Sequence, residues 1–204
     1  MRDPDGRGFH VAGFELLGRI DPERVALVSE DLDVLAGEIR LAPALTAHAR
    51  LYRERRDVDA VVHLHSHHIA VLSSTGSVVG DYHVSAALFT GSQVLHTDDG
   101  RSPHSAVVDT LGKAKVAIMQ NHGALIASGS IQHAVVEAIT LESCARIHLE
   151  CVAAGGRELH ADEMAAARRN FRPYYLAHMW EALLDRTRSE CPELFEARAS
   201  QPSS

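Results

Sequence analysis

The alternation of apolar and polar positions divides this chain into short segments of two kinds. Valine-rich apolar runs and alternating runs predict β-strands, and apolar residues that recur every three or four positions predict helices. Strands are expected at residues 8–14, 24–31, 59–65 and 92–97, with a strand, a turn and a strand across 115–128. Helices are expected at residues 44–55, 69–73, 105–112, from 130 towards 156, and from 161 to 188, where Pro173 interrupts or follows the first piece.

Two helical stripes are specific expectations about the core. In the helix that Ser130 can cap, the residues expected to be buried are Ile131, Val135, Ala138 and Ile139. In the last helix the core stripe is expected to be Tyr175, Met179 and Trp180. Strands and helices mix without regular strand–helix–strand alternation, which predicts an α/β fold with a mixed sheet flanked by helices. We expect one domain over residues 1–196 and a disordered tail at 197–204.

Composition narrows the class of protein. The 204 residues are 46% hydrophobic and 23% charged, which are globular values, and the net charge of -7 argues against a nucleic-acid partner. The gathered basic residues are interleaved with acidic ones, as in a solvated helix end: Arg50, Arg53, Arg55 and Arg56. No apolar run is long enough to span a bilayer. The three cysteines form no C-x-x-C pair, so we expect neither a disulfide framework nor a thiolate zinc site, and a cytoplasmic location.

The stretch "VVHLHSHHIA", residues 61–70, places four histidines within six positions. Side chains two apart in a strand point to one face, so His63 and His65 project together while Leu64 turns the other way. Two such imidazoles can reach one metal ion at about 2.0–2.1 Å if it is zinc. His122 stands between Asn121 and Gly123, just after an apolar strand, and is the expected third ligand.

The remaining histidines have ordinary explanations in a chain with 14 of them. We expect His67 and His68 to line a pocket, to support a ligand or to face solvent. For the others we expect solvent contact, helix caps or common core contacts: His10, His96, His104, His133, His148, His160 and His178.

Two of these segments together resemble the class II aldolase/adducin family. "RRDVDAVVHLHS" matches that family's first histidine motif, and "AIMQNHGALIASG", about sixty residues later, matches its second. The resemblance implies a three-layer α/β/α fold with a central mixed, mainly antiparallel sheet. It also implies a divalent metal ion (zinc, manganese, iron or cobalt) on His63, His65 and His122. In the family's sugar-phosphate aldolases, tetramers place the site between subunits, so we expect a homo-oligomer whose 173–186 segment lies near a neighbouring subunit.

The chain departs from the sugar-phosphate aldolases where those bind phosphate. Two phosphate-site segments of those aldolases are replaced, by "VAGF" at residues 11–14 and by "APAL" at residues 42–45. A further phosphate-site segment, a glycine–asparagine loop near the start of the aldolases, would precede the first residue of this sequence. Ala44 stands where their acid/base glutamate would be. This resembles the adducin-like branch, which includes metal-dependent decarboxylases and oxygenases of aromatic acids as well as non-catalytic adducin heads.

The leading functional hypothesis is therefore a metal-dependent lyase for a small hydroxylated acid, best matched by a decarboxylase of dihydroxyphthalate-like aromatic acids. Decarboxylation needs charge stabilisation and a proton donor but no base that attacks a C–H bond. The expected donors are His68 first, then Tyr82, His83 and Tyr175. The alternative for His68 is solvent exposure or support of a ligand, for Tyr82 and His83 it is loop packing, and for Tyr175 it is the core stripe named above. The alternatives are a retro-aldolase for a non-phosphorylated substrate, a non-haem iron oxygenase, and a non-catalytic interaction domain.

Overall fold

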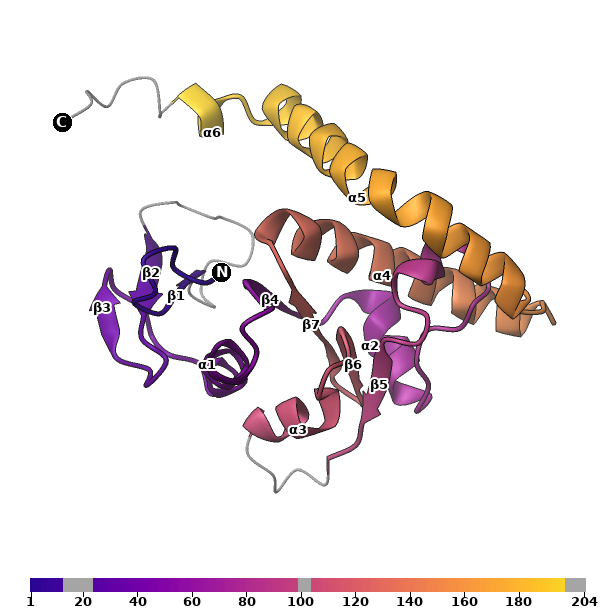
Figure 1. Cartoon of the computed structure of the whole chain (residues 1–204), viewed down its shortest axis with the longest axis horizontal. Coiled ribbons are helices and arrows are strands. Elements are labelled where there is room, and N and C mark those ends of the chain that lie inside the picture. Colours follow the sequence, from indigo (N-terminus) through magenta and orange to yellow (C-terminus); the bar gives the residue numbers. More distant parts are fainter. Residues whose placement is uncertain (13–23, 99–103, 197–204) are drawn as a thin grey trace.

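The computed structural model describes residues 1–12, 24–98 and 104–196, and its strands pair into two sheets (Figure 1). The first sheet is antiparallel, in the order β1 (Phe9–Ala12), β2 (Val25–Val28) and β3 (Val34–Ala36). The second is mixed, in the order β4 (Ala60–Leu64), β7 (Gly123–Ser128), β6 (Val116–Met119) and β5 (Gln93–His96). Only β5 and β6 run parallel. The predicted α/β class with a mixed, mainly antiparallel arrangement is confirmed, although the strands are divided between two sheets.

Helices cover both faces of the second sheet and form three layers with it (Figure 1). On one face lie α1 (Leu45–Glu54), the 3-10 helix η4 (His104–Ala106) and α3 (Val107–Leu111). The other face carries α2 (His67–Ser74), the 3-10 helix η3 (Val84–Leu88), α4 (Ile131–Ala153) and α5 (Ala161–Glu190), which α6 (Glu193–Glu196) follows. Within the described ranges, none of these helices has the length and apolarity to cross a membrane.

The pleat of β4 decides which layer each of its side chains enters. Val61 packs into the core beneath α1 and α3, whereas Val62 and Leu64 pack against the core on the α4 side. His63 is two residues after Val61 and therefore points towards α1 and α3. The alternating pattern read from the sequence is thus confirmed, and it aims the first histidine of the motif into the α1–α3 layer.

The helix α4 does not bury the stripe predicted for it. Ile139 is 48% exposed, and Ile131, Val135 and Ala138 are only half-buried. The face that the helix buries consists of Ala134, Val136, Glu137, Thr140, Leu141, Cys144 and Ala145. Small residues on this face let the helix approach the sheet closely, and the buried Glu137 carboxylate accepts a hydrogen bond from Lys115 Nζ. Apolarity alone therefore identified the wrong face.

One further expectation about the helices is corrected. The helix α5 runs without a break from residue 161 to residue 190, so Pro173 neither interrupts nor ends it. The core stripe predicted for its second half is present, because Tyr175, Met179 and Trp180 pack against the core on the α4 side. The predicted disordered tail, residues 197–204, lies outside the described residues.

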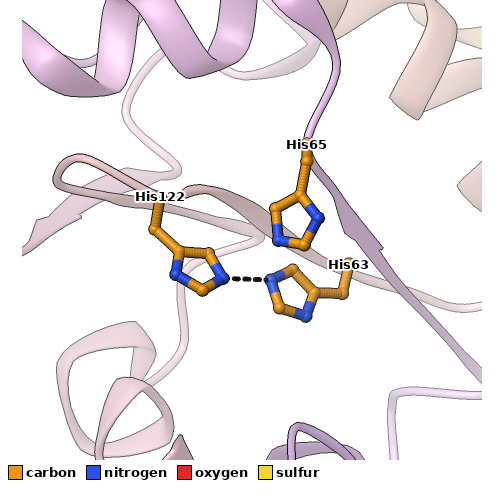
Figure 2. Close-up of side chains that lie close together, drawn as sticks. All are labelled: His63, His65 and His122. Carbon is orange, nitrogen blue, oxygen red and sulfur yellow. Dashed lines mark hydrogen bonds between the residues drawn. The ribbon is translucent and has the colours of Figure 1, made fainter.

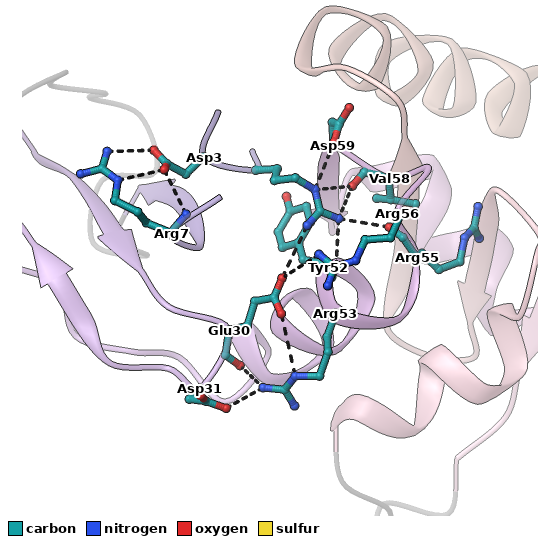
Figure 3. A network of polar contacts seen from close by, with 11 residues as sticks. Asp3, Arg7, Glu30, Asp31, Tyr52, Arg53, Arg55, Arg56, Val58 and Asp59 are labelled. Atoms are coloured by element: carbon teal, nitrogen blue, oxygen red, sulfur yellow. Dashed lines mark hydrogen bonds and ion pairs between the residues drawn. The ribbon is translucent and has the colours of Figure 1, made fainter. Parts of the chain in front are cut away.

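Of the arginines expected at a solvated helix end, Arg53 and Arg56 are exposed as expected, whereas Arg55 is half-buried (Figure 3). Arg55 and Arg2 bind specific partners in this region. The Arg2 guanidinium donates to the backbone carbonyls of Tyr52, Arg55 and Val58 and forms an ion pair with Asp59. Arg55 donates to two carbonyl oxygens after α3, those of residues 112 and 114. The N-terminus, α1 and the end of α3 are thereby tied to the residues that lead into β4.

Candidate metal centre

The rings of His63, His65 and His122 converge on one point (Figure 2). Each ring offers one ligand nitrogen, and these three nitrogen atoms all lie within 4.8 Å of one another. The Nε2 atoms of His63 and His122 are 3.1 Å apart, and the ring centroids are separated by 4.6 to 5.1 Å. His63 is half-buried, whereas His65 and His122 are exposed, so one side of the cluster is open to solvent.

The turn between β6 and β7 places His122 beside β4. The His122 N–H donates to the Met119 carbonyl at 3.0 Å, which closes a four-residue turn. Its third position, Asn121, has a φ of 56°, a left-handed conformation that asparagine tolerates better than most residues. Because β7 pairs directly with β4, the residue before β7 emerges next to the end of β4.

Gly123 allows the two strands to come this close. A side chain at this position would place its Cβ 2.3 Å from the Leu64 carbonyl oxygen and 2.9 Å from the His65 ring. Only glycine fits there, since backbone atoms of β4 cannot move aside without breaking the pairing. Each residue of the "NHG" turn therefore has a separate physical role: a left-handed turn position, a ligand and a close approach.

Two rings of the cluster, those of His63 and His122, are favoured in the neutral form that binds metal ions, because folding lowers their pKa values. Burial, followed by the nearby rings of His65, His122 and His104, lowers the pKa of His63 to about 4. Burial also lowers the pKa of His122, together with the nearby rings of His65 and His104. Nitrogen ligands at about 2.0–2.1 Å around a tetrahedral ion lie about 3.3 Å apart, close to the spacing of the two Nε2 atoms. The residues therefore fit a divalent ion with three imidazole ligands and an open side.

A cleft of about 210 Å³ adjoins the cluster on the α1–α3 side. Its apolar wall is formed by Ala44, Ala47, Val107, Met119 and Leu125. Two of the three converging histidines, His63 and His122, line it together with Asn121. Its other polar groups are His96, Asp98, His104 and Gln120. Ala44 thus faces the site where the resemblance places a glutamate in the aldolases, and none of the described lining residues is lysine or arginine.

Three histidines in this region were missed as site residues. His104 and His96 line the cleft, and the electrostatic effect of His104 reaches both His63 and His122. His48, on α1, lies near His63, and burial, followed by this ring, lowers its pKa to about 3. No motif marks these three positions, because they reach the site from separate elements that only the tertiary fold brings together.

The predicted proton donors do not line the cleft of their own chain. His68 is the second residue of α2, and its Nδ1 is 2.7 Å from a carboxylate oxygen of Glu142. Tyr82 packs edge-on against the ring of His148, and His83 is exposed beside Ser85. The Tyr175 hydroxyl is 3.2 Å from that of Thr140, in the layer on the opposite face of the sheet.

We expect the metal-free protein to lose stability as the pH falls from about 6.5 towards about 4. Over this range His48 and His63 are protonated in the unfolded chain but stay largely neutral in the folded chain, because folding lowers both pKa values. Unfolding then binds protons, so stability falls with decreasing pH, by up to about 1.4 kcal/mol per pH unit for each histidine. Urea unfolding at a series of pH values measures this slope.

Matched variants identify the source of the slope. His48→Gln should flatten it, because the buried titrating ring is removed. His133→Gln, at an exposed position on α4, should leave it unchanged. A slope that persists in full in both His48→Gln and His63→Gln would show that other groups titrate on unfolding.

Comparison with known proteins gives matches along most of the chain. The model of the Class II Aldolase and Adducin N-terminal domain matches residues 3–149. The chain is 30% identical to the 3,4-dihydroxyphthalate decarboxylase of Terrabacter sp. over 133 residues, which cover 60% of this chain and 56% of that protein. It is 27% identical to the 5-deoxy-D-ribulose 1-phosphate aldolase of Bacillus thuringiensis over 158 residues, 75% of this chain and 74% of that protein.

A solved structure shows the same fold. The L-fuculose 1-phosphate aldolase from Glaciozyma antarctica superposes with a TM-score of 0.82 at 24% identity, over 93% of this chain and 79% of that one. At this identity the likeness establishes the fold alone. The chain spans about half the length of the dihydroxyphthalate decarboxylases that it matches.

Proposed function

The chain belongs to the class II aldolase and adducin N-terminal domain family, and from this we propose that it is a divalent-metal-dependent carbon–carbon lyase. Within that class we propose decarboxylation of a small hydroxylated aromatic acid of the dihydroxyphthalate kind. The observation that carries the proposal is the set of three converging imidazoles beside a cleft that has no α1 carboxylate.

Different residues of the chain would bind the ion and face the substrate. His63, His65 and His122 would hold the ion. An imidazole that binds a metal ion is a neutral ligand, so it leaves the positive charge of the ion undiminished. When bound, a divalent ion supplies a Lewis acid that stabilises negative charge on substrate oxygen atoms. We propose that the apolar wall around Ala44 and Ala47 faces the aromatic ring of the substrate; this wall carries no carboxylate of its own.

Decarboxylation breaks the bond between a ring carbon and its carboxylate, and the electron pair of that bond remains on the ring carbon. Carbon dioxide leaves, and one proton must reach the same ring carbon to complete the product. We propose His104 as the proton donor, because it lines the cleft and lies near His63 and His122. His68 remains a second proposal, at the rim beyond the end of β4.

Two of the other predicted donors would act only at a site shared between subunits. Tyr82 and His83 lie away from the cleft of their own chain, so each would have to reach the cleft of another copy. Tyr175 packs against the core of its own chain, where its hydroxyl contacts that of Thr140. We propose a homo-oligomer, a tetramer by analogy with the family's aldolases, in which such a contribution is possible. An isolated chain would then hold the ion and lack part of the wall around the substrate.

Two alternatives have specific support. The similarity to a 5-deoxy-D-ribulose 1-phosphate aldolase favours a retro-aldolase, and three imidazoles suit iron as well as zinc, manganese or cobalt, which keeps an oxygenase possible. A non-catalytic interaction domain fits less well, because a binding scaffold has no use for three imidazoles that converge.

Phosphate recognition separates the decarboxylase from a sugar-phosphate aldolase. A phosphate dianion is usually bound by charge-assisted hydrogen bonds from lysine, arginine or a helix N-terminus, and the described lining of the cleft contains neither of these residues. We therefore expect a ketose 1-phosphate and the corresponding free ketose to bind the metal-loaded protein equally weakly, within about threefold. None of the described lining residues is lysine or arginine, and the N–H groups at the beginning of α1 already bind backbone carbonyl oxygens. A dihydroxybenzoate should bind more tightly than both.

Isothermal titration calorimetry measures all three ligands on the same preparation. The control is the His63→Ala variant, in which binding of the aromatic acid should be lost if it depends on the metal site. Micromolar binding of the ketose 1-phosphate that disappears with its phosphate group would refute the proposed substrate class and favour the aldolase.

A further inference from the structure

Glu142, on α4, reaches across to the beginning of α2, directly after the two histidines of β4. Its carboxylate accepts four hydrogen bonds. The Ser66 hydroxyl donates at 2.5 Å, and the backbone N–H groups of His68 and Ile69 donate at 3.0 Å each. The His68 ring nitrogen Nδ1 lies at 2.7 Å. A single side chain from a distant helix therefore holds the whole first turn of α2.

This carboxylate caps the N-terminus of α2 in place of the helix's own N-cap side chain. Ser66 is the N-cap residue of α2, but its side chain caps no backbone N–H of the helix. Its hydroxyl donates to Glu142 instead. Glu142 also accepts hydrogen bonds from the backbone N–H groups of His68 and Ile69 in the first turn of α2. A negative charge at a helix N-terminus is favourable, because the unpaired N–H groups there carry partial positive charge.

Glu142 is charged in this position. Burial raises its pKa, but the hydrogen bonds from Ser66, His68 and Ile69 outweigh that effect and hold the pKa below its usual value. Hydrogen bonds to an ionised acceptor are shorter and stronger than those between neutral groups. The turn from Ser66 to Ile69 is therefore fixed more firmly than a serine cap would fix it.

The same turn determines where His65 lies. The last residue pair between β4 and β7 is Leu64 with Ala124, so His65 follows the end of the strand pairing. Its backbone is held on one side by Leu64 and on the other by Ser66, which Glu142 binds. The His65 ring is exposed, so packing restrains it less than the half-buried ring of His63. A shift of the turn would move this ring relative to His63 and His122.

We propose that Glu142 is a positioning residue for the metal site, which holds the Ser66–Ile69 turn so that His65 converges with His63 and His122. This inference rests on the proposed metal-dependent function. It also gives His68 a structural role: the pairing with Glu142 orients the ring, so that Nε2 is the nitrogen left for other contacts. Metal affinity is thereby coupled to α4, an element that supplies no ligand itself.

The test compares Glu142→Ala with Leu141→Val. Leu141 is the preceding residue of α4 and is fully buried in the core. It takes no part in the hydrogen bonds to the turn, so its truncation lowers stability while Glu142 keeps its partners. We expect zinc affinity, measured by competition with a chelator, to fall about tenfold to a hundredfold in Glu142→Ala, as for other residues that orient metal ligands. Leu141→Val should bind zinc within about twofold of the parent protein, because the turn is intact.

Two readouts separate positioning from a general loss of stability. The visible spectrum of the cobalt-loaded protein reports ligand geometry and should change in Glu142→Ala but not in Leu141→Val. Glu142→Gln keeps the length of the side chain and one acceptor oxygen, and it should give an intermediate affinity. Amide hydrogen exchange at His68 and Ile69 in the metal-free protein should accelerate at least about tenfold in Glu142→Ala alone, as expected when a local turn opens.

Each outcome decides one of the two proposals. Unchanged zinc affinity and an unchanged cobalt spectrum in Glu142→Ala would overturn the positioning role. If the parent protein itself binds neither zinc nor cobalt, the proposed function fails. In that case the exchange experiment still judges the turn, and unchanged exchange at His68 and Ile69 shows that Glu142 does not hold it.

Discussion

Replacing His63, His65 or His122 with alanine is expected to lower zinc affinity several hundredfold in each case. The ion-binding free energy of a protein zinc site is at least about 10 kcal/mol, and one of three ligands carries on the order of a third of it. The three nitrogens already lie within 4.8 Å of one another, so the folded chain needs little rearrangement to bind the ion. Loss of one of them leaves two imidazoles and water, a much weaker site.

The measurement is zinc affinity by chelator competition, with metal content determined on protein purified without an affinity tag. His67→Ala is the matched control, because His67 belongs to the same histidine-rich stretch but is not part of the converging set. It should bind zinc as the parent protein does. The proposed site is wrong if all three ligand variants retain parental affinity, or if His67→Ala loses as much as they do.

The sequence sufficed to predict this cluster because its geometry is mostly local. The alternation of side chains along a strand predicts that His63 and His65 share a face. The strand β4 ends at Leu64, directly before His65, and the two rings converge as predicted. The "NHG" turn adds the third ring, because Asn121 takes the left-handed conformation and Gly123 lets β7 approach β4. Each of these statements depends on neighbours in the chain or on one strand pairing.

The parts that could not be predicted depend on contacts between distant segments. Glu142 is 74 residues from His68, the residue it binds twice, and nothing in the sequence around it distinguishes it from a surface glutamate. His104 was taken for an ordinary histidine, because the approach of η4 to the cluster follows from the packing of α1 against η4 and α3.

The misassigned face of α4 has the same origin. Counting apolar residues favours Ile139, yet the helix turns Glu137 inward because Lys115, on another element, neutralises that carboxylate. A buried ion pair of this kind becomes possible only when both partners are brought together by folding. Hydrophobic periodicity contains no information about such a partner, so the stripe it selected was displaced around the helix.

The metal-loaded protein is expected to release carbon dioxide from a dihydroxyphthalate or a related hydroxylated aromatic acid in the absence of oxygen. Removal of the ion should lower the rate at least about a thousandfold, since a Lewis acid contributes several kcal/mol to charge stabilisation and 1.36 kcal/mol corresponds to about tenfold in rate. His104→Gln should lower kcat about a hundredfold to ten-thousandfold, the usual contribution of a positioned proton donor. Its zinc content should remain at the parental level, because His104 lies outside the converging set.

Anaerobic turnover with a panel of dihydroxybenzoates and dihydroxyphthalates distinguishes the hypotheses. Carbon dioxide and the ring product are both measured, and decarboxylation should form them in equal amounts. His68→Gln is the informative comparison for His104→Gln, because the His68 ring is paired with Glu142 and lies outside the lining of the cleft. A larger loss of kcat in His68→Gln than in His104→Gln would identify His68, at the beginning of α2, as the proton donor. Turnover that requires oxygen would establish the oxygenase instead. If none of these acids releases carbon dioxide while a non-phosphorylated hydroxy-carbonyl compound is cleaved, the apolar wall at Ala44 and Ala47 serves a retro-aldolase.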